Sequence, residues 1–348
     1  MTRVYLDHAA TTPPRAQALV AVDEGFARWA NPSSPHAQGR KARALLEDAR
    51  ERCKQALDWD GELIFTSGAS EAAALALHNV KAGARLVSAV EHDCIRGTAK
   101  DAERLPVQPD GALDLEMLNE AVQRECPLVA VQHVNSETGN RQDLEAVVRT
   151  VHSAGGLLLA DCAQSAGKLA MPPCDMAIIS AHKFGGPIGI GALLLRDYNL
   201  LEPVGGHERG YRRGTENLPA ALGMAAALEA KAPYLSDEVL EARERLAATV
   251  RNAGGIWFAD RLFDPVPFVN ALAMPEMSAT AQVMRFDMAG FAVSQGSACS
   301  SGTMKTSHVM SAMAVDEAVA DRTIRVSLGW NTTPQEVDAF AKTWAQLQ

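Results

Sequence analysis

Lys183 occupies a position from which its side-chain amine could react with an aldehyde. It lies in the segment 180–187, Ser-Ala-His-Lys-Phe-Gly-Gly-Pro, directly after the apolar run 176–179. A lysine at a strand end, followed by glycines, can be approached closely because glycine has no side chain to obstruct a bound molecule. Such an amine can form a covalent imine bond with a carbonyl compound. A solvated surface lysine also fits the pattern, so other groups must decide between the two.

Asp161 places a negative charge at a second strand end. It follows the run 157–160, Leu-Leu-Leu-Ala, which has the composition of a buried strand. A buried carboxylate is costly unless it has a partner, and a protonated ring nitrogen is one such partner. A turn or helix-capping role is the alternative. Because Asp161 precedes Lys183 by 22 residues, two neighbouring strands could deliver both groups to one cleft.

The segment 66–71, Thr-Ser-Gly-Ala-Ser-Glu, is typical of a phosphate site. A strand that runs through a glycine turn into a helix presents free backbone N–H groups and the positive helix end to an anion. Ser70 could instead serve only as a helix cap. Taken with Lys183 and Asp161, the segment completes the set that pyridoxal 5'-phosphate requires: an imine, a partner for the ring nitrogen and an anion site.

Cys299 lies in the segment 293–302, Val-Ser-Gln-Gly-Ser-Ala-Cys-Ser-Ser-Gly. Glycines and serines around it predict a mobile, exposed loop rather than a packed core. A thiol there could reach a bound substrate, react and present its product elsewhere, since a free cysteine with a pKa of roughly 8.5 supplies some thiolate. The other cysteines form no Cys-x-x-Cys pair and are expected to be free thiols that pack as small apolar residues; they are Cys53, Cys94, Cys126, Cys162 and Cys174.

Short apolar runs alternate with helical patterns through the first two thirds of the chain, which predicts an α/β domain with a largely parallel sheet. From about residue 218 the pattern changes to an alanine-rich helix that could bridge to a smaller α+β lobe. Strands are expected at 63–66, 85–90, 128–131, 157–160, 176–179, 191–195, 269–273 and 323–327, and helices at 71–80, 115–124, 144–154, 220–232 and 236–252.

The composition is that of a globular protein with a large core. The 348 residues are 47% apolar and 22% charged, a length and balance that favour two lobes. The net charge of −9 repels phosphate backbones and anionic lipid, so neither nucleic acid nor membrane is an expected partner. The start has no secretory pattern and no long apolar run occurs, which predicts a cytoplasmic location.

Beyond these single features, the chain resembles the cysteine desulfurases of the NifS/IscS type, in the class V aminotransferase branch of the fold-type I pyridoxal-phosphate enzymes. The resemblance extends over nearly the whole length, and several motifs in order are far more specific than any one. They lie at 5–13, 31–34, 66–71, 91–92, 133–139, 161–165, 180–183, 206–210, 213–215, 296–299 and 324–329.

The resemblance implies a fold and a reaction. The fold is a large cofactor-binding domain, 15–230, with a mostly parallel seven-stranded sheet between helices, and a small α+β domain, 1–14 with 231–348, that carries the Cys299 loop. The reaction converts L-cysteine to L-alanine and leaves a persulfide on Cys299, which supplies sulfur for iron-sulfur clusters, thio-cofactors or tRNA. A homodimer and a sulfur-acceptor protein are implied as partners.

The resemblance also assigns roles to single residues. Lys183 would bind the cofactor covalently and shuttle protons, Asp161 would pair with the ring nitrogen, and Gln164 would contact the ring oxygen. His92 would stack on the ring and act in acid-base steps. The phosphate would be held by Ala69, Ser70, Ser180 and His182, and by Thr215 from the partner subunit.

Substrate recognition is implied for Asn135, which would also contact the cofactor, and for Arg325, which would clamp the substrate carboxylate. No resident metal is expected, although Cys299 could transiently ligate a nascent iron-sulfur cluster. Departures from the family pattern, such as Ala72, Ala73 and Ala74 after Glu71 and an end at Gln348 without a long tail, leave the sulfur acceptor open.

Two alternatives remain at this point. One is a selenocysteine lyase or another lyase or aminotransferase of the same branch, although plain transamination needs no loop cysteine. The other is a non-catalytic scaffold that keeps the fold for partner binding, which the joint presence of Lys183, Asp161 and Cys299 disfavours.

Overall fold

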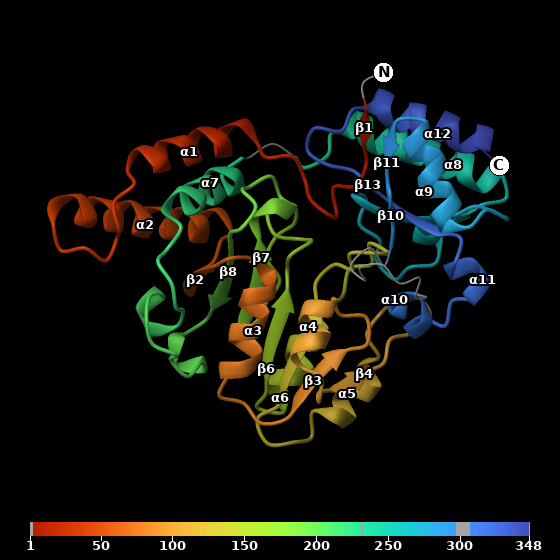
Figure 1. Cartoon of the computed structure of the whole chain (residues 1–348). Coiled ribbons are helices and arrows are strands. Elements are labelled where there is room, and N and C mark those ends of the chain that lie inside the picture. The colour runs from red at the N-terminus through yellow and green to blue at the C-terminus, as the bar shows by residue number, and fades with distance from the viewer. Residues whose placement is uncertain (1–2, 231–232, 297–306, 348) are drawn as a thin grey trace.

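A seven-stranded sheet forms the centre of the larger unit (Figure 1). The computed structural model describes residues 3–230, 233–296 and 307–347. Most strands are short aliphatic runs that are buried along their length, as expected for a sheet covered on both faces. In order across the sheet they are β2 (Glu62–Thr66), β8 (Gly191–Leu195), β7 (Met176–Ser180), β6 (Leu157–Asp161), β5 (Leu128–Gln132), β3 (Arg85–Ser88) and β4 (Glu103–Leu105).

The sheet is mostly parallel, as predicted. From β7 to β4 each strand runs parallel to its neighbour, whereas β8 is antiparallel to both β2 and β7. The six strands predicted for this part of the chain are all present. The edge strand β4 was not predicted because its sequence, Glu-Arg-Leu, is too short and too polar to stand out.

Helices cover both faces of this sheet (Figure 1). One face packs against α3 (Ala69–Asn79) and α4 (Asp93–Thr98) through an aliphatic cluster. The opposite face packs against the helices α2 (Ala37–Ala56), α5 (Leu115–Ala121), α6 (Leu144–Ser153) and α7 (Leu218–Leu228), with α1 (Ala16–Ala27) lying on α7.

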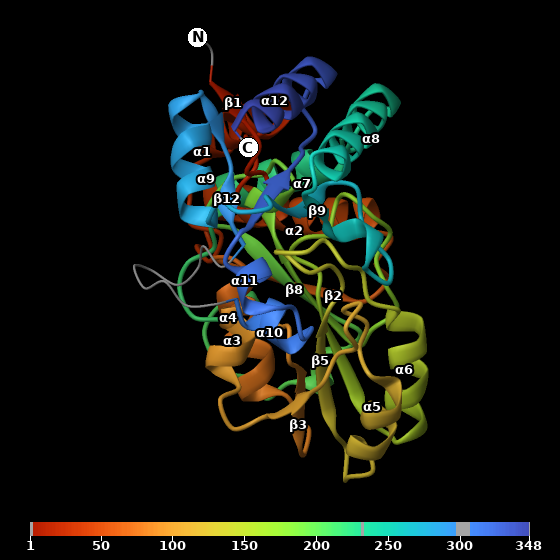
Figure 2. The same cartoon turned by 90° about the vertical axis from the view of Figure 1, so that its right-hand side faces the viewer.

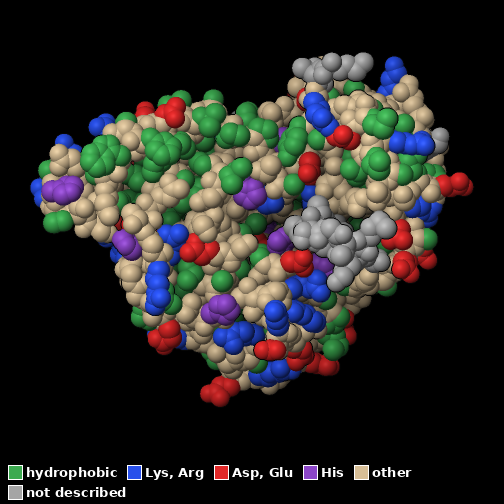
Figure 3. Space-filling model, in the orientation of Figure 1, with side chains coloured by type: hydrophobic (Ala, Val, Ile, Leu, Met, Phe, Trp, Pro, Cys, Tyr) green, Lys and Arg blue, Asp and Glu red, His purple; other side chains and the backbone are tan. Residues whose placement is uncertain are grey.

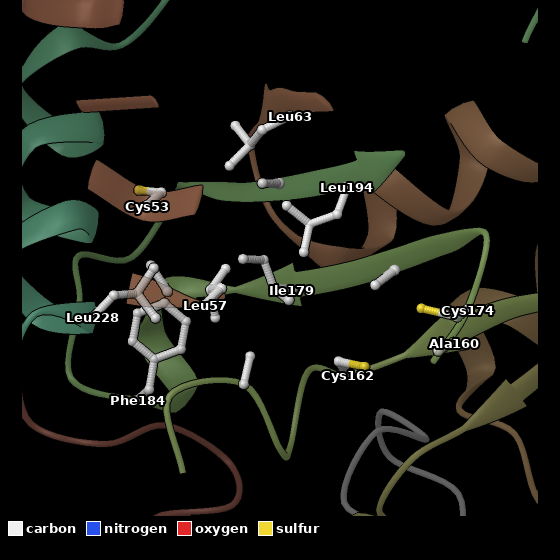
Figure 4. Packing of buried hydrophobic residues seen from close by; sticks show 14 of the residues in the cluster. Cys53, Leu57, Leu63, Ala160, Cys162, Cys174, Ile179, Phe184, Leu194 and Leu228 are labelled. Carbon is white, nitrogen blue, oxygen red and sulfur yellow. The ribbon is translucent and has the colours of Figure 1, made fainter. Parts of the chain in front are cut away.

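Cysteines of the larger core pack as apolar side chains, as their sequence context predicts. Cys53, Cys162 and Cys174 are buried in the cluster that Figure 4 shows, among residues such as Ile179 and Leu194. Burial raises the pKa of the Cys53 thiol to about 12. These thiols are therefore protonated at neutral pH and poor nucleophiles.

A smaller unit is built around a four-stranded antiparallel sheet with the order β12-β13-β10-β9. Figure 2 shows α8 and α12 side by side at the top of the molecule, and both pack on the core of this unit. The elements are α8 (Asp237–Asn252), β9 (Ile256–Trp257), β10 (Val269–Ala273), α9 (Ala279–Met288), β11 (Phe291–Ala292), β12 (Ser294–Gln295), α10 (His308–Ala312), α11 (Glu317–Ala320), β13 (Thr323–Ser327) and α12 (Pro334–Leu347).

The N-terminal strand belongs to this smaller unit, although the next elements belong to the larger one. Strand β1 (Val4–Tyr5) pairs in parallel with β11, and Ser327 of β13 donates its backbone N–H to the carbonyl of Leu6. Both chain ends lie on this unit in Figure 1. The exact division of the chain at residues 14 and 230 stays a prediction.

The predicted bridging helix over 220–232 is wrong at its C-terminal end. Helix α7 begins at Leu218, after an Asn217 cap, and ends at Leu228. Alanine-rich sequence favours helix beyond that point, but Glu229 already caps the end, so α7 is not a continuous bridge. In the described part of the chain, no helix has both the length and the apolar character needed to cross a membrane.

A buried ion pair fastens the loop between β8 and α7 to the sheet. Both carboxylate oxygens of Glu208 accept from the Arg50 guanidinium, at 2.7 and 3.1 Å, and one also accepts from the backbone N–H of Phe65 at 2.9 Å. Both side chains are about 2% exposed or less. Glu208 and Arg209 both have left-handed backbone conformations, with φ of 47° and 56°, so the loop depends on this anchor to hold an unfavourable geometry.

We predict that Glu208→Gln lowers the free energy of unfolding by about 3 kcal/mol, because the buried Arg50 guanidinium then keeps only the less buried Glu47 as its counter-ion. Denaturant unfolding followed by circular dichroism measures this change. The matched control is Asp338→Asn, which breaks the exposed pair between Arg245 and Asp338 and should cost less than about 1 kcal/mol. Equal costs for the two variants would contradict the prediction.

Candidate active site

A cavity of about 550 Å³ opens at the C-terminal ends of the parallel strands. Ligands of α/β proteins bind at this edge of the sheet because the loops and helix starts that follow the strands converge there. Many of the residues singled out in the sequence line it together: Ala69, Ser70, His92, Asp161, Gln164, Ser180, His182, Lys183 and Arg325.

Lys183 reaches the cavity from a single 3-10 turn, Ala181–Lys183, directly after β7. Its amine donates to the backbone carbonyls of Ala9, at 2.7 Å, and Ala10, at 2.8 Å. These carbonyls belong to the N-terminal segment and were not predicted, because a backbone oxygen leaves no mark in the residue type. The turn and the N-terminal segment together fix where the amine lies.

Asp161 ends β6, the parallel neighbour of β7, so the two predicted groups reach the same cavity. Its Oδ1 accepts from the backbone N–H of Ala163 at 2.9 Å. Burial raises the pKa of Asp161, whereas this hydrogen bond and the positive charges of His92 and Lys183 oppose the shift. A cationic group bound beside Asp161 would therefore favour its ionised form.

The N-terminus of α3 forms another part of the cavity wall. The backbone of Gly68 at its N-cap has φ of 153°, and a Cβ on Gly191 would lie 2.8 Å from the Gly68 Cα. Only glycine at position 191 therefore lets α3 start this close to strand β8. The Ser180 Oγ faces the same turn, 3.7 Å from an ideal Cβ on Gly68. Hydroxyls and free N–H groups thus meet at a helix N-terminus, a suitable site for a phosphate.

Two histidines line the cavity in fixed orientations. The His92 Nδ1 accepts from the backbone N–H of Cys94 at 3.1 Å and so caps α4. The His182 Nδ1 pairs with the Thr11 hydroxyl at 3.1 Å. Burial, followed by the charges of Lys183 and Lys168, lowers the pKa of His182 to about 4. His182 is therefore neutral at pH 7.

Arg325 approaches from β13 of the smaller unit and is 4% exposed. It donates to Asp7 Oδ1 at 2.8 Å and to the carbonyl of Ser136 at 2.9 Å. Its Nε is buried and has no hydrogen-bond partner among the described residues. A small carboxylate in the cavity could satisfy this guanidinium by competing with Asp7.

Two predicted site residues, Asn135 and Thr215, do not line the cavity. Asn135 is 2% exposed, and its Oδ1 accepts from the backbone N–H groups of Glu137 and Thr138, so it shapes a turn behind the wall. Thr215 is exposed on the loop that Glu208 anchors. Cys299 lies outside the described residues. The roles predicted for all three stay predictions.

Glu91 is a buried acid next to the site, and no role was predicted for it. Its Oε1 accepts from the backbone N–H of Gln132 at 2.6 Å, and Gln132 pairs with Asp161 in the sheet. Burial, followed by the negative charge of Asp161, raises the pKa of Glu91 well above its ordinary value. Of the two carboxyl groups, Glu91 and Asp161, Asp161 is therefore the one that is favoured in its ionised form. The sequence signal for Glu91 was only its place in a family motif beside His92.

Comparisons with known proteins agree with this geometry. Residues 4–340 match the family model described as Aminotransferase class-V. A cysteine desulfurase of Cereibacter sphaeroides is 36% identical, covering 97% of this chain and 94% of that protein. The structure of a NifS-like protein superposes with a TM-score of 0.89 at 29% identity, covering 99% of each chain. SspA in complex with cysteine gives a TM-score of 0.82 at 28% identity, covering 95% of this chain and 100% of that one.

The chain therefore belongs to the class V aminotransferase family, and within it to the cysteine desulfurases of the NifS/IscS type. Membership of this family implies a pyridoxal 5'-phosphate cofactor. The likeness covers both structural units, including the strand that carries Arg325.

His8 is a buried histidine whose neutral form stabilises the N-terminal segment. It is 2% exposed, and its ring nitrogens contact the hydroxyls of Thr12 and Thr332. Burial, followed by the charge of Lys168, lowers the pKa of His8 to about 4. Because the unfolded chain binds the proton more readily, the stability from neutral His8 is present above pH ~6.5 and is lost as the pH falls towards 4.

We predict that His8→Gln reduces the loss of stability between pH 7.5 and 4.5 by up to about 3 kcal/mol relative to the unmodified protein. Denaturant unfolding of the cofactor-free protein at both pH values measures the difference. His78→Gln, at an exposed histidine on α3, is the matched control and should keep the original pH dependence. An unchanged dependence in His8→Gln would refute the role of the buried imidazole.

Proposed function

We propose that this cavity binds pyridoxal 5'-phosphate and that the chain uses it to convert L-cysteine to L-alanine, passing the sulfur to Cys299 as a persulfide. The observation that carries the proposal is the convergence of Lys183, Asp161 and the α3 N-terminus on one cavity. The bound cofactor would supply an electron sink for bonds at the substrate α-carbon.

The residues present fit the cofactor. Asp161 is a buried carboxylate whose ionised form gains from a cationic ring nitrogen, and the glycine-lined start of α3 leaves room for a phosphate. Neutral His182 can donate one N–H without adding charge. The proposed contacts are Lys183 by covalent attachment, together with Ala69, Ser70, His92, Asp161, Gln164, Ser180, His182 and, from a second copy of the chain, Thr215. Asn135 would act through the turn that it holds behind the wall.

Lys183 would move the proton of the substrate α-carbon. The carbonyls of Ala9 and Ala10, 2.7 and 2.8 Å away, would hold its amine when it is not bound to the cofactor. Two fixed acceptors limit the directions from which the amine can take or give a proton. His92, on the cavity wall, is the second candidate for proton transfer.

Arg325 would bind the substrate carboxylate. Its Nε has no hydrogen-bond partner in the described part of the chain, and the guanidinium can exchange Asp7 for an incoming carboxylate without losing a charged partner. Asn135 supports this subsite from behind, because it holds the turn that presents the Ser136 carbonyl to Arg325. L-cysteine held by its carboxylate keeps its sulfur available for the next step.

Cys299 would accept that sulfur. Both described ends of its loop meet Glu137: the Ser307 hydroxyl donates to Glu137 Oε2 at 2.6 Å, and an ideal Cβ on Gly296 would lie 2.9 Å from the same oxygen. Glu137 directly follows Ser136 on the cavity wall. The Cys299 thiolate attacks the substrate sulfur, so an S–S bond forms as the C–S bond breaks, and the carbon fragment takes up protons to become alanine.

A homodimer is part of the proposal. Apolar side chains gather over α1, at the upper left of Figure 3. They include Trp29 just after the helix, 82% exposed, and Phe26, 66% exposed. Exposed apolar patches of this kind mark interaction surfaces. A protein that receives the sulfur is the second proposed partner, and an iron-sulfur scaffold or a sulfur relay protein would fit; the cytoplasmic location stays a prediction.

We predict that Cys299→Ser binds the cofactor with an unchanged visible absorbance but loses at least about 99% of alanine formation from L-cysteine, since no thiolate attacks the substrate sulfur. Single-turnover mixing, with alanine assayed and the persulfide located by mass spectrometry, measures this. Cys126→Ser, a half-exposed cysteine away from the cavity, is the control and should stay active. Full activity in Cys299→Ser would refute the acceptor role.

Lys183→Ala should lose the covalently bound cofactor altogether.

We predict that Trp29→Asp weakens self-association by at least about 30-fold, because a large aromatic side chain at the centre of an interface contributes roughly 2 kcal/mol or more. Sedimentation velocity over a range of concentrations measures the dimer dissociation constant. Met288→Asp changes an equally exposed apolar residue on α9 and should leave the dimer intact. A monomeric unmodified protein would overturn the proposed assembly.

A further inference from the structure

Lys168 is a second lysine near the cavity, and the reaction described above does not use it. It follows Gly167 in the turns after β6. Its Nζ lies 5.0 Å from the centroid of the Tyr234 ring and 4.9 Å from that of Phe268. Both rings belong to the core of the smaller unit. A cation is attracted to the faces of aromatic rings, so Lys168 is held at a defined point between the two units.

From this point Lys168 begins a chain of contacts that ends at the cofactor lysine. Its Nζ lies 3.5 Å from Gln164 Oε1, and Gln164 Nε2 donates to the Ala9 carbonyl at 2.8 Å. The same Ala9 oxygen accepts from the Lys183 Nζ at 2.7 Å. Gln164 and Lys183 are therefore bound to one backbone oxygen, and Lys168 contacts the far end of the Gln164 amide.

The chemistry of an ammonium group fixes which way that amide points. The rings of Tyr234 and Phe268 favour the charged form of Lys168. That ammonium has three donors and no acceptor, so only the Oε1 end of Gln164 can face it favourably. A flipped amide would place two donor groups together at Lys168 and two acceptor oxygens together at Ala9. Without Lys168, the amide would lose one of the two contacts that hold its orientation.

We propose that Lys168 is a positioning residue, which holds the Gln164 amide with its Nε2 donor directed at the Ala9 carbonyl and the cavity. The inference rests on the proposed function, because the donor so presented would serve the ring oxygen of the bound cofactor. Lys168 touches neither cofactor nor substrate in this arrangement and acts through Gln164.

Electrostatics support a close link between Lys168 and the site. Burial and the charge of Lys183 lower the pKa of Lys168 well below its ordinary value, whereas the negative faces of Tyr234 and Phe268 favour its charged form. The charge of Lys168 in turn contributes to the lowered pKa values of His8 and His182. A change at Lys168 should therefore be felt at the cofactor site.

A double-mutant cycle tests the proposal, using Lys168→Met, Gln164→Ala and the combined variant. Cofactor-free protein is titrated with pyridoxal 5'-phosphate, and both the dissociation constant and the absorption maximum of the bound form are recorded. Lys168→Met should weaken binding about tenfold and shift the absorption maximum. In the Gln164→Ala background the same change should have less than about a third of that effect, because residues that act through one another are not additive.

Controls separate positioning from general stability. Lys168→Arg keeps a cation that can only donate, so it should show the absorption maximum of the unmodified protein. If Lys168→Met does not fold, Lys168→Gln takes its place in the cycle. Lys342→Met, at an exposed lysine on α12, should match the unmodified protein. Additive effects in the cycle, or an unshifted absorption maximum in Lys168→Met, would overturn the proposal for Lys168 alone. An unmodified protein that does not bind the cofactor would instead overturn the proposed function.

Discussion

The bond between the Lys183 amine and the carbonyls of Ala9 and Ala10 is the constraint on which the site depends. The lysine belongs to the central sheet, whereas the carbonyls belong to a segment that the smaller unit holds: the Ala9 N–H donates to the hydroxyl of Ser327 at 2.8 Å. Any movement between the units would therefore change the surroundings of this amine. Arg325 lies only two residues before Ser327, so a movement between the units would also change its position relative to Lys183.

The acids and histidines around the cavity differ in how readily they become ionised. Asp161 is favoured as the anion because Glu91 is disfavoured, and His182 is kept neutral by burial and two nearby lysines. In a site of low dielectric, each additional charge would act strongly on the rest. The arrangement suits a ligand that brings its own cation and anion, one at the sheet edge and the other at a helix start.

Most of this structure could be predicted from the sequence, because some elements leave a clear residue pattern and others do not. Aliphatic runs such as 176–179 identify buried strands, while polar β4 gives no such signal. Alanine content overextended α7 because helix propensity ignores the tertiary contacts that end a helix. Lys183, Asp161 and the α3 start were found because side-chain chemistry is visible in sequence. Other features depend on packing between distant segments, which no local pattern encodes. These are the Ala9 and Ala10 carbonyls, the position of Asn135 behind the wall and the rings around Lys168.

The pairing of β1 with β11 has a consequence for the order in which the protein is made. Residues 4–12 leave the ribosome before the central sheet, yet their backbone partners include Gly290, Ala292 and Ser327, which emerge after it. The central sheet can form during translation, since domains generally fold as they emerge. The segment 4–12, however, has to wait for β11 and β13. The pocket around Lys183 is therefore completed only after β13 has been made, and a nascent chain that stops before β13 lacks a finished reaction centre.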